Sequence, residues 1–217
     1  MAEFRRRAHM RIGIVGAGWL GGSVGRAWVR SGHEVMFSSR HPERLRSEIR
    51  NLGALASAGT VAEAAAFGPV VLVATPYAAL PDIGPEHAAA LAGKVVLDAT
   101  NPWGGEPLQA DVERDGVAIT SARLLPGTRL VRVFSAVDAS DVEASSLGRG
   151  RKLGVPLAGD DADAVETAAR LVRDAGCEPL VVGGLASARS FQRHGPGFRA
   201  NTDYAKLRRI LGLTESA

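Results

Sequence analysis

The chain alternates short apolar runs with longer stretches in which apolar residues recur at helical spacing. Residues 12–15, 70–74 and 94–98 are dominated by apolar side chains, as is typical of strands in a parallel sheet covered on both faces. Between the first two runs, the apolar residues within 20–28 fall on one face of a helix, and Gly32 is placed to end it. The pattern therefore predicts strands and helices in alternation.

Weaker signals extend this alternation along the chain. In the first half they predict strands at 33–38 and 54–56 and helices at 42–50, 62–66 and 85–91. In the second half they predict strands at 130–134, 154–157 and 178–182, a helix from a cap at Asp160 or Asp161 to Gly176, and helical segments at 186–191 and 203–211. Residues 145–151 are expected to form a domain boundary or an exposed loop.

Three glycines stand between the first apolar run and the first predicted helix: Gly16, Gly18 and Gly21. A strand, a turn with this glycine spacing and a helix together form a nucleotide-phosphate site. The first glycine permits the tight turn, the second lets the backbone approach a diphosphate, and the third lets helix and strand pack closely. The N–H groups at the start of the helix then face the anion. The motif predicts a dinucleotide site.

The end of the second predicted strand distinguishes NADP from NAD. In NAD-binding versions of this arrangement, an acidic residue there accepts hydrogen bonds from the ribose hydroxyls. Here Ser38, Ser39 and Arg40 occupy the place, and Arg44 follows one helical turn later. Hydroxyls and a guanidinium can hold a 2′-phosphate through charge-assisted hydrogen bonds, whereas a carboxylate would repel it. The alternative is a polar loop with a solvated arginine. We predict NADP as the cofactor.

These signals together predict an α/β fold, specifically a Rossmann-type doubly wound, mostly parallel sheet with a small C-terminal α/β extension. We expect a disordered tail at residues 1–9, an NADP-binding Rossmann domain at 10–145, and an extension at 146–217 packed on the same domain.

Composition narrows the class of protein. Hydrophobic residues make up 46% of the chain, which is enough for a core. The net charge is +3, of which the first nine residues supply +2, and aromatic residues are only 5%, so we expect no nucleic-acid binding. No apolar run reaches the roughly 18 residues of a membrane span. The single cysteine, Cys177, fits a reducing compartment and a half-buried apolar role. We expect a soluble, cytoplasmic protein with a small-molecule redox substrate.

The sequence offers no acid–base constellation. His87 and His194 have no carboxylate or serine partner at a known spacing and are expected at the surface, like His33 in its predicted turn. No HExxH motif or Cys/His cluster occurs, so we predict no metal. Ser121 and Ser190 lack the context of a nucleophile elbow. We therefore predict no catalytic side chain, because hydride transfer between stacked rings depends on positioning.

An ordered set of segments is distinctive beyond the glycine turn. The segments are 10–18 (MRIGIVGAG), 32–35 (GHEV), 38–40 (SSR), 74–77 (ATPY), 98–102 (DATNP), 133–137 (VFSAV), 158–161 (AGDD) and 182–189 (VGGLASAR). Together they resemble the NADPH-dependent F420 reductases of the coenzyme F420-dependent NADP oxidoreductase family. The resemblance implies hydride transfer between NADPH and the deazaflavin coenzyme F420, in a homodimer.

The resemblance also implies roles for particular residues. Residues of the glycine turn would contact the diphosphate: Ala17, Gly18, Trp19 and Leu20. Residues after the second strand would hold the 2′-phosphate: Ser39, Arg40 and Arg44. Residues after later strands would border the ribose and nicotinamide: Thr75, Pro76, Asn101 and Val137.

We expect Pro76, Ser135 and Val137 to line an apolar substrate pocket that clamps the two rings face to face. Two features depart from the family pattern. Ser135 stands where an Asn or His is common, and residues 191–198 do not match the expected apolar C-terminal helix. A reductase of another acceptor (flavin, ferric iron or an imine) and a non-catalytic NADP-binding sensor remain alternatives.

Overall fold

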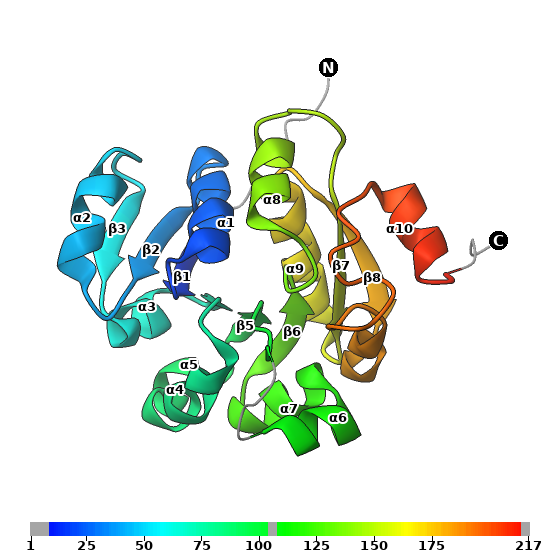
Figure 1. Cartoon of the computed structure of the whole chain (residues 1–217). Coiled ribbons are helices and arrows are strands. Elements are labelled where there is room, and N and C mark those ends of the chain that lie inside the picture. Colours follow the sequence, from blue (N-terminus) through cyan, green and yellow to red (C-terminus); the bar gives the residue numbers. More distant parts are fainter. Residues whose placement is uncertain (1–8, 104–107, 214–217) are drawn as a thin grey trace.

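The computed structural model describes residues 9–103 and 108–213. Within these residues, eight strands form one sheet in the order β3-β2-β1-β4-β5-β6-β7-β8 (Figure 1). The strands are β1 (Arg11–Val15), β2 (Glu34–Ser38), β3 (Ala56–Gly59), β4 (Val70–Val73), β5 (Val95–Asp98), β6 (Arg129–Val133), β7 (Gly154–Gly159) and β8 (Glu178–Gly183).

The first six strands are parallel, β7 pairs antiparallel with β6, and β8 pairs parallel with β7. The chain first builds outward from β1 to β3 and then returns to place β4 on the other side of β1. This reversal confirms the predicted Rossmann-type, doubly wound and mostly parallel sheet. Ligands of such sheets bind outside the carboxyl ends of the strands at the point of reversal, which here lies between β1 and β4.

Helices cover both faces of the sheet. They are α1 (Trp19–Arg30), α2 (Pro42–Arg50), α3 (Val61–Phe67), α4 (Leu80–Glu86), α5 (Ala88–Leu91), α6 (Gln109–Asp115), α7 (Val117–Leu124), α8 (Ala139–Ser146), α9 (Ala162–Asp174) and α10 (Tyr204–Ile210), with 3-10 turns η1 (Tyr77–Ala79) and η2 (Leu185–Ser190).

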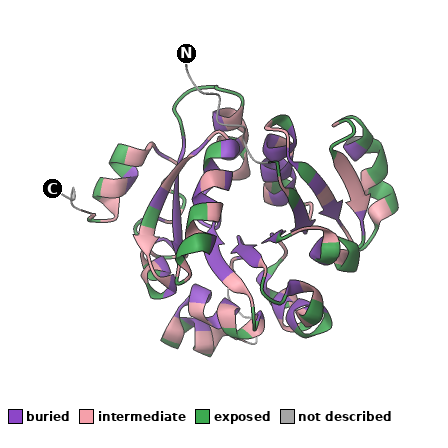
Figure 2. Cartoon of the chain, turned by 180° about the vertical axis from the view of Figure 1, so that it is seen from behind, coloured by how far each residue is buried: buried purple, intermediate pink, exposed green. Residues whose placement is uncertain are grey.

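The core consists of two apolar layers, one on each face of the sheet. Strand residues alternate between them, so that Ile12 and Ile14 contribute to the layer under α1, α2, α8 and α9, while Val15 contributes to the layer under α3 to α7. Figure 2 shows the strands as a mainly buried centre between the helices. Both faces of the parallel strands are covered, as their apolar runs predict.

Local sequence signals set several helix ends. Thr60 and Glu63 form a capping box at the start of α3, and the side chain of Asp161 accepts a hydrogen bond from the Ala164 N–H at the start of α9. Gly32 and Gly176 follow α1 and α9 with φ angles of 93° and 78°. These left-handed conformations confirm the predicted helix ends.

Some predicted boundaries are wrong. The predicted helix at 85–91 is two helices, α4 and α5, on either side of His87. α4 starts earlier than predicted, at Leu80, and Pro81 lies in its first turn, where a proline is tolerated. The predicted third strand at 54–56 lies later, at β3. The sequence pattern missed α6, α7 and α8, each of eight residues or fewer, too short for a clear helical period.

The predicted domain division stays a prediction. β7 and β8 of the predicted extension continue the same sheet as β1 to β6. The predicted tail lies outside the described residues except for His9. No helix in the described part of the chain has the length and apolar character needed to cross a bilayer.

Cys177 is fully buried rather than half-buried as expected. Burial raises the pKa of its thiol to about 11. The thiolate is the reactive form of cysteine, so this side chain behaves as a small core residue.

His33 is the clearest error among the expected surface residues, because it is only 1% exposed. Its Nδ1 accepts a hydrogen bond from the Met10 N–H at 3.2 Å, and its Nε2 lies 3.1 Å from Oδ2 of Asp174. The ring therefore joins the start of β2 to the end of α9. Burial lowers the pKa of His33, although the hydrogen bond and the charge of Asp174 act in the opposite direction.

This lowered pKa predicts a loss of stability in acid. The unfolded chain takes up the proton at a higher pH than the folded one, so stability is complete above the unfolded pKa and declines as the pH falls below it. Urea unfolding at a series of pH values between about 8 and 5 measures the slope. We expect a smaller slope in His33→Gln than in the wild type or in His41→Gln, which changes an exposed histidine. Equal slopes in all three proteins would contradict this account.

Candidate functional site

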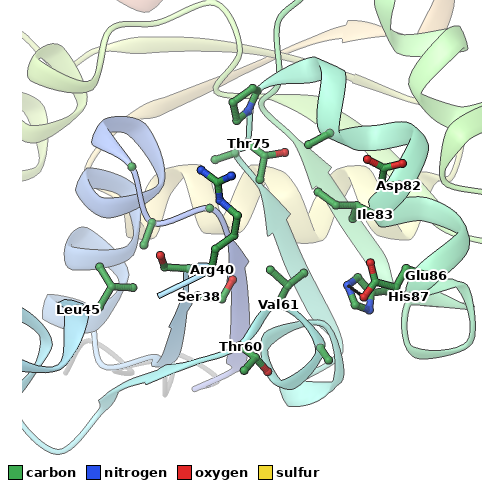
Figure 3. A pocket seen from close by; sticks show the side chains of 18 residues that line it. Ser38, Arg40, Leu45, Thr60, Val61, Thr75, Asp82, Ile83, Glu86 and His87 are labelled. Atoms are coloured by element: carbon green, nitrogen blue, oxygen red, sulfur yellow. Dashed lines mark ion pairs between the residues drawn. The ribbon is translucent and has the colours of Figure 1, made fainter. Parts of the chain in front are cut away.

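A cleft of about 740 Å³ opens at the carboxyl edge of the sheet, where the strand order reverses. We call it the switch-point cleft. Its lining residues come from the ends of β1, β2, β3 and β4 and from the helices that follow them: Gly16, Ala17, Gly18, Ser38, Ser39, Arg40, Leu45, Thr60, Val61, Ala62, Ala74, Thr75, Pro76, Ala79, Asp82, Ile83, Glu86 and His87. Figure 3 shows the side chains converging on this space from opposite sides.

The glycine turn joins β1 to α1 at one end of the cleft. Gly16 has a φ of 98°, which favours glycine. A Cβ on Gly21 would lie 2.2 Å from the carbonyl oxygen of Gly16, so only glycine fits there. Gly18 differs from both, because its φ is −73° and a Cβ at this position would have no atom within 4 Å. The fold itself does not require glycine at position 18, and the bare backbone leaves room for a ligand.

Two substitutions separate these roles. Gly18→Ala should change the melting temperature little, since alanine restricts the unfolded chain but is a poorer N-cap residue than glycine, while it should weaken NADPH binding about tenfold or more. Gly21→Ala should destabilise the fold, because backbone atoms must move to admit the methyl group. Thermal unfolding and NADPH titration of both variants check this. Unaltered NADPH affinity in a folded Gly18→Ala protein would contradict the assignment of the turn to a diphosphate.

The other residues of the turn are placed differently. The N–H of Ala17 donates to the Ser38 carbonyl at 3.1 Å, so that amide is used within the protein. Trp19 begins α1 and is 92% exposed, Leu20 is half-buried and Gly21 is buried. α1 has no side-chain cap, which leaves its first N–H groups available to an anion.

The end of β2 brings Arg40 to the cleft. Figure 3 shows its side chain extending into the cavity toward Thr75. No carboxylate of the described residues lies within ion-pair distance of Arg40. The hydroxyl of Ser39 also lines the cleft and accepts a hydrogen bond from the His41 N–H at 3.1 Å. This corner therefore offers an uncompensated positive charge beside a hydroxyl, a combination that suits a phosphate.

Two other residues predicted for this corner are not positioned in the same way. Ser38 lines the cleft, but its hydroxyl donates to the Ile14 carbonyl at 2.8 Å and holds β2 to β1. Arg44 lies on the exposed surface of α2 and is not among the residues that line the cleft.

The opposite wall was missed by sequence reasoning. It consists of Asp82, Ile83, Glu86 and His87 on and after α4, seen across the cavity from Arg40 in Figure 3. His87 was expected at the surface, which is wrong: it is 9% exposed, and its Nε2 lies 3.9 Å from Oε1 of Glu86. The only signal in the sequence was that a helix following β4 must pack beside the cleft.

A second missed group comes from the start of α3: Thr60, Val61 and Ala62. Its sequence signal was the Thr60–Glu63 spacing of a capping box, which marks a helix that starts at the carboxyl edge of the sheet.

The residues predicted after β5 and β6 form a buried network beside the cleft. The Nδ2 of Asn101 donates to the Ser135 carbonyl at 2.7 Å, and its Oδ1 accepts a hydrogen bond from Arg132 at 2.8 Å. Arg132 also forms an ion pair with Asp98 at 2.8 Å, and both side chains are fully buried. The amide of Asn101 is thus used to join two loops, and Val137 is buried. Asn101, Ser135 and Val137 are not among the residues that line the switch-point cleft.

Two buried hydroxyls at this edge lack partners. Among the described residues, neither Oγ1 of Thr75 nor Oγ of Ser135 has a hydrogen-bond partner. Buried polar atoms are nearly always satisfied, so each unpaired hydroxyl indicates a place for a polar ligand group or a water. No group of three or more potential metal ligands gathers anywhere in the described ranges.

Comparisons with known proteins agree with this geometry. Residues 11–102 match the family described as NADP oxidoreductase, coenzyme F420-dependent. The metalloreductase STEAP3 of Rattus norvegicus is 31% identical over 196 residues, which cover 88% of this chain and 37% of that protein. The chain thus spans little more than a third of the length of this relative.

Two solved structures resemble the whole fold. The hypothetical protein SMa0349 of Sinorhizobium meliloti gives a TM-score of 0.76 at 25% identity, covering 89% of this chain and 95% of that one. A candidate F420-dependent NADP reductase from Arthrobacter sp. FB24 gives a TM-score of 0.69 at 27% identity, covering 83% and 88%. Residues 11–102 are thus similar to the coenzyme F420-dependent NADP oxidoreductases, and the whole fold is similar to that of a candidate F420-dependent NADP reductase.

Proposed function

We propose that this protein is an oxidoreductase that transfers a hydride between NADPH and a deazaflavin, coenzyme F420. The observation that carries the nucleotide half is the pairing of Gly18 with Arg40 in one cleft. Gly18 leaves space that the fold does not fill, and Arg40 carries a charge that no described carboxylate compensates. A dinucleotide with a 2′-phosphate matches both features.

The residues around the cleft fit NADP in a definite direction. The first turn of α1 would hold the diphosphate, and Arg40 with Ser39 would hold the 2′-phosphate. The adenine would then lie between Arg40 and the α4 wall, where Ile83 offers an apolar surface. The far end of the dinucleotide would reach the loops after β4 and β6, where Thr75 and Ser135 have unpaired hydroxyls.

When bound, NADPH supplies the hydride. The protein then has to position the nicotinamide and the acceptor, and no side chain has to activate either of them. Pro76 lacks an N–H and presents an apolar ring at the end of β4. We propose that Pro76, Ser135 and Val137 border the nicotinamide and the acceptor. Their part would be to align the rings and exclude water, and holding two reactants in this way lowers a barrier by roughly 7–11 kcal/mol.

A second acceptor class has an observation in its favour. The identity with a rat protein named a metalloreductase favours electron delivery to a metal ion. The likeness to the Arthrobacter protein, named for F420 and NADP, favours the deazaflavin and covers most of both chains. We place the deazaflavin first for that reason. We also propose that the protein forms a homodimer, as the family resemblance implies.

An acceptor panel tests the proposal. NADPH absorbance loss is followed with coenzyme F420, FMN, ferric citrate and a cyclic imine, with the NADPH dissociation constant measured separately. We expect turnover with F420. Tight NADPH binding with turnover only of another acceptor would replace the deazaflavin. Tight binding with no turnover would favour a sensor, and absence of NADPH binding would reject the nucleotide site itself.

A further inference from the structure

An aromatic and cationic cluster stands on the nicotinamide side of the proposed site. Trp103 lies five residues beyond β5, at the carboxyl edge of the sheet. β5 adjoins β4 on the side away from β1 and β2, and neighbouring strands are about 4.8 Å apart. The strand that leads into Trp103 is therefore on the side of β4 that lies away from β2, the strand that leads into Arg40.

Two residues from the end of the chain hold this indole in place. The guanidinium carbon of Arg193 lies 5.5 Å from the centre of the Trp103 ring, and Arg193 also donates a hydrogen bond to the Trp103 carbonyl. The ring of Phe198 packs edge-on, with 6.4 Å between ring centres and 64° between ring planes. Trp103 nevertheless remains 59% exposed. We call Trp103, Arg193 and Phe198 the Trp103 cluster.

The segment that carries Arg193 and Phe198 is anchored to the loop after β6. The N–H of Arg199 donates to the Ala136 carbonyl at 2.9 Å, and its guanidinium lies 2.7 Å from Oδ1 of Asp138. Asn201 Oδ1 accepts a hydrogen bond from the Asp138 N–H at 3.0 Å. His194, Arg199 and Asn201 adopt positive φ angles of 70°, 53° and 41°. Such conformations persist where surrounding contacts fix them. The segment is thus a formed wall next to Ser135 and Val137.

Arg193 adds a charge that the protein does not neutralise. Among the described residues, no carboxylate lies within ion-pair distance of Arg193, whereas Arg199 is paired with Asp138. The Arg193 guanidinium lies over the indole ring without a carboxylate partner among the described residues, while more than half of Trp103 stays exposed. This pair suits a flat aromatic ligand that bears an anionic group.

We propose that the Trp103 cluster is the acceptor-recognition surface, and that the acceptor is a planar, phosphate-bearing aromatic of flavin or deazaflavin type. This inference rests on the proposed function, because it assigns the second reactant of the same site. The acceptor ring stacks on the surface of Trp103 that Arg193 and Phe198 leave exposed, and Arg193 contacts its phosphate.

A pair of matched ligands tests the ring stacking on Trp103 and the phosphate contact of Arg193 separately. Dissociation constants of FMN and riboflavin, which share a ring and differ by the phosphate, are measured by calorimetry on the full chain saturated with NADP⁺. We expect Arg193→Gln to weaken FMN about tenfold and leave riboflavin unchanged, and Trp103→Ala to weaken both about tenfold. Arg193→Lys should retain part of the preference for FMN. Arg209→Gln, an exposed substitution on α10 with the same loss of charge, should change neither.

Different results have different meanings. Equal FMN affinity in the wild type and Arg193→Gln, or no binding of FMN, riboflavin or coenzyme F420 to the NADP⁺-loaded wild type, would overturn the acceptor surface. The nucleotide part of the proposed function would stand in that case if NADPH still binds. Loss of NADPH binding in the wild type would instead reject the proposed function.

Discussion

Arg40→Ala is expected to raise the dissociation constant for NADPH about 10- to 100-fold while leaving that for NADH within about twofold. Arg40 is the cleft residue whose positive charge faces the proposed 2′-phosphate. None of the carboxylates that the structure describes forms an ion pair with Arg40, so phosphate binding breaks no existing ion pair. NADH lacks that phosphate, so it loses little. Fluorescence titration of both nucleotides with wild type and variant gives the four constants.

Controls on α2 sharpen this result. Arg50→Ala removes an exposed charge whose Nε donates to the Arg46 carbonyl, and it should change neither constant. Arg44→Ala tests a residue that the resemblance assigns to the phosphate but that does not line the cleft, so we expect a smaller loss than for Arg40→Ala. Equal losses for NADPH and NADH in Arg40→Ala would show that Arg40 does not recognise the phosphate.

Asp98→Asn is expected to lower the free energy of unfolding by about 3–5 kcal/mol. Asp98 and Arg132 form an ion pair with both side chains fully buried, and the variant leaves the guanidinium without its counter-charge. Oδ1 of Asp98 also accepts hydrogen bonds from the N–H and hydroxyl of Thr100, at 2.9 and 2.6 Å. The change therefore weakens the loops after β5 and β6 as well. Urea unfolding measures the effect.

An exposed ion pair provides the comparison. Arg129 and Asp161 are about two-fifths exposed and lie 3.1 Å apart, so Arg129→Gln should cost less than about 1 kcal/mol. The double variant Asp98→Leu/Arg132→Met should recover much of the loss, because it leaves no buried charge. A cost for Asp98→Asn no greater than that for Arg129→Gln would contradict the role given to the buried pair.

The glycine turn at the end of β1 could be predicted because its signals are local. The backbone geometry requires glycine at positions 16 and 21. The spacing of these glycines is visible in the sequence. The end of β2 could also be predicted, since a strand followed by Ser39 and Arg40 delivers them to the sheet edge. Short-range patterns are the part of a fold that a sequence displays directly.

The remaining features depend on contacts between distant segments. His33 becomes a core residue because Asp174, 141 positions later, comes to lie beside it. The α4 wall was missed because only tertiary packing turns His87 inward. Trp103 is held by Arg193, 90 positions away. No periodicity along the chain reports such pairs.

A crystal structure of the protein with NADP⁺ tests the central claim most directly. We predict the 2′-phosphate within hydrogen-bond distance of the Arg40 guanidinium and the Ser39 hydroxyl, and the diphosphate over Gly18 at the start of α1. A nucleotide bound elsewhere, or one in this cleft with Arg40 turned away from its phosphate, would contradict the account.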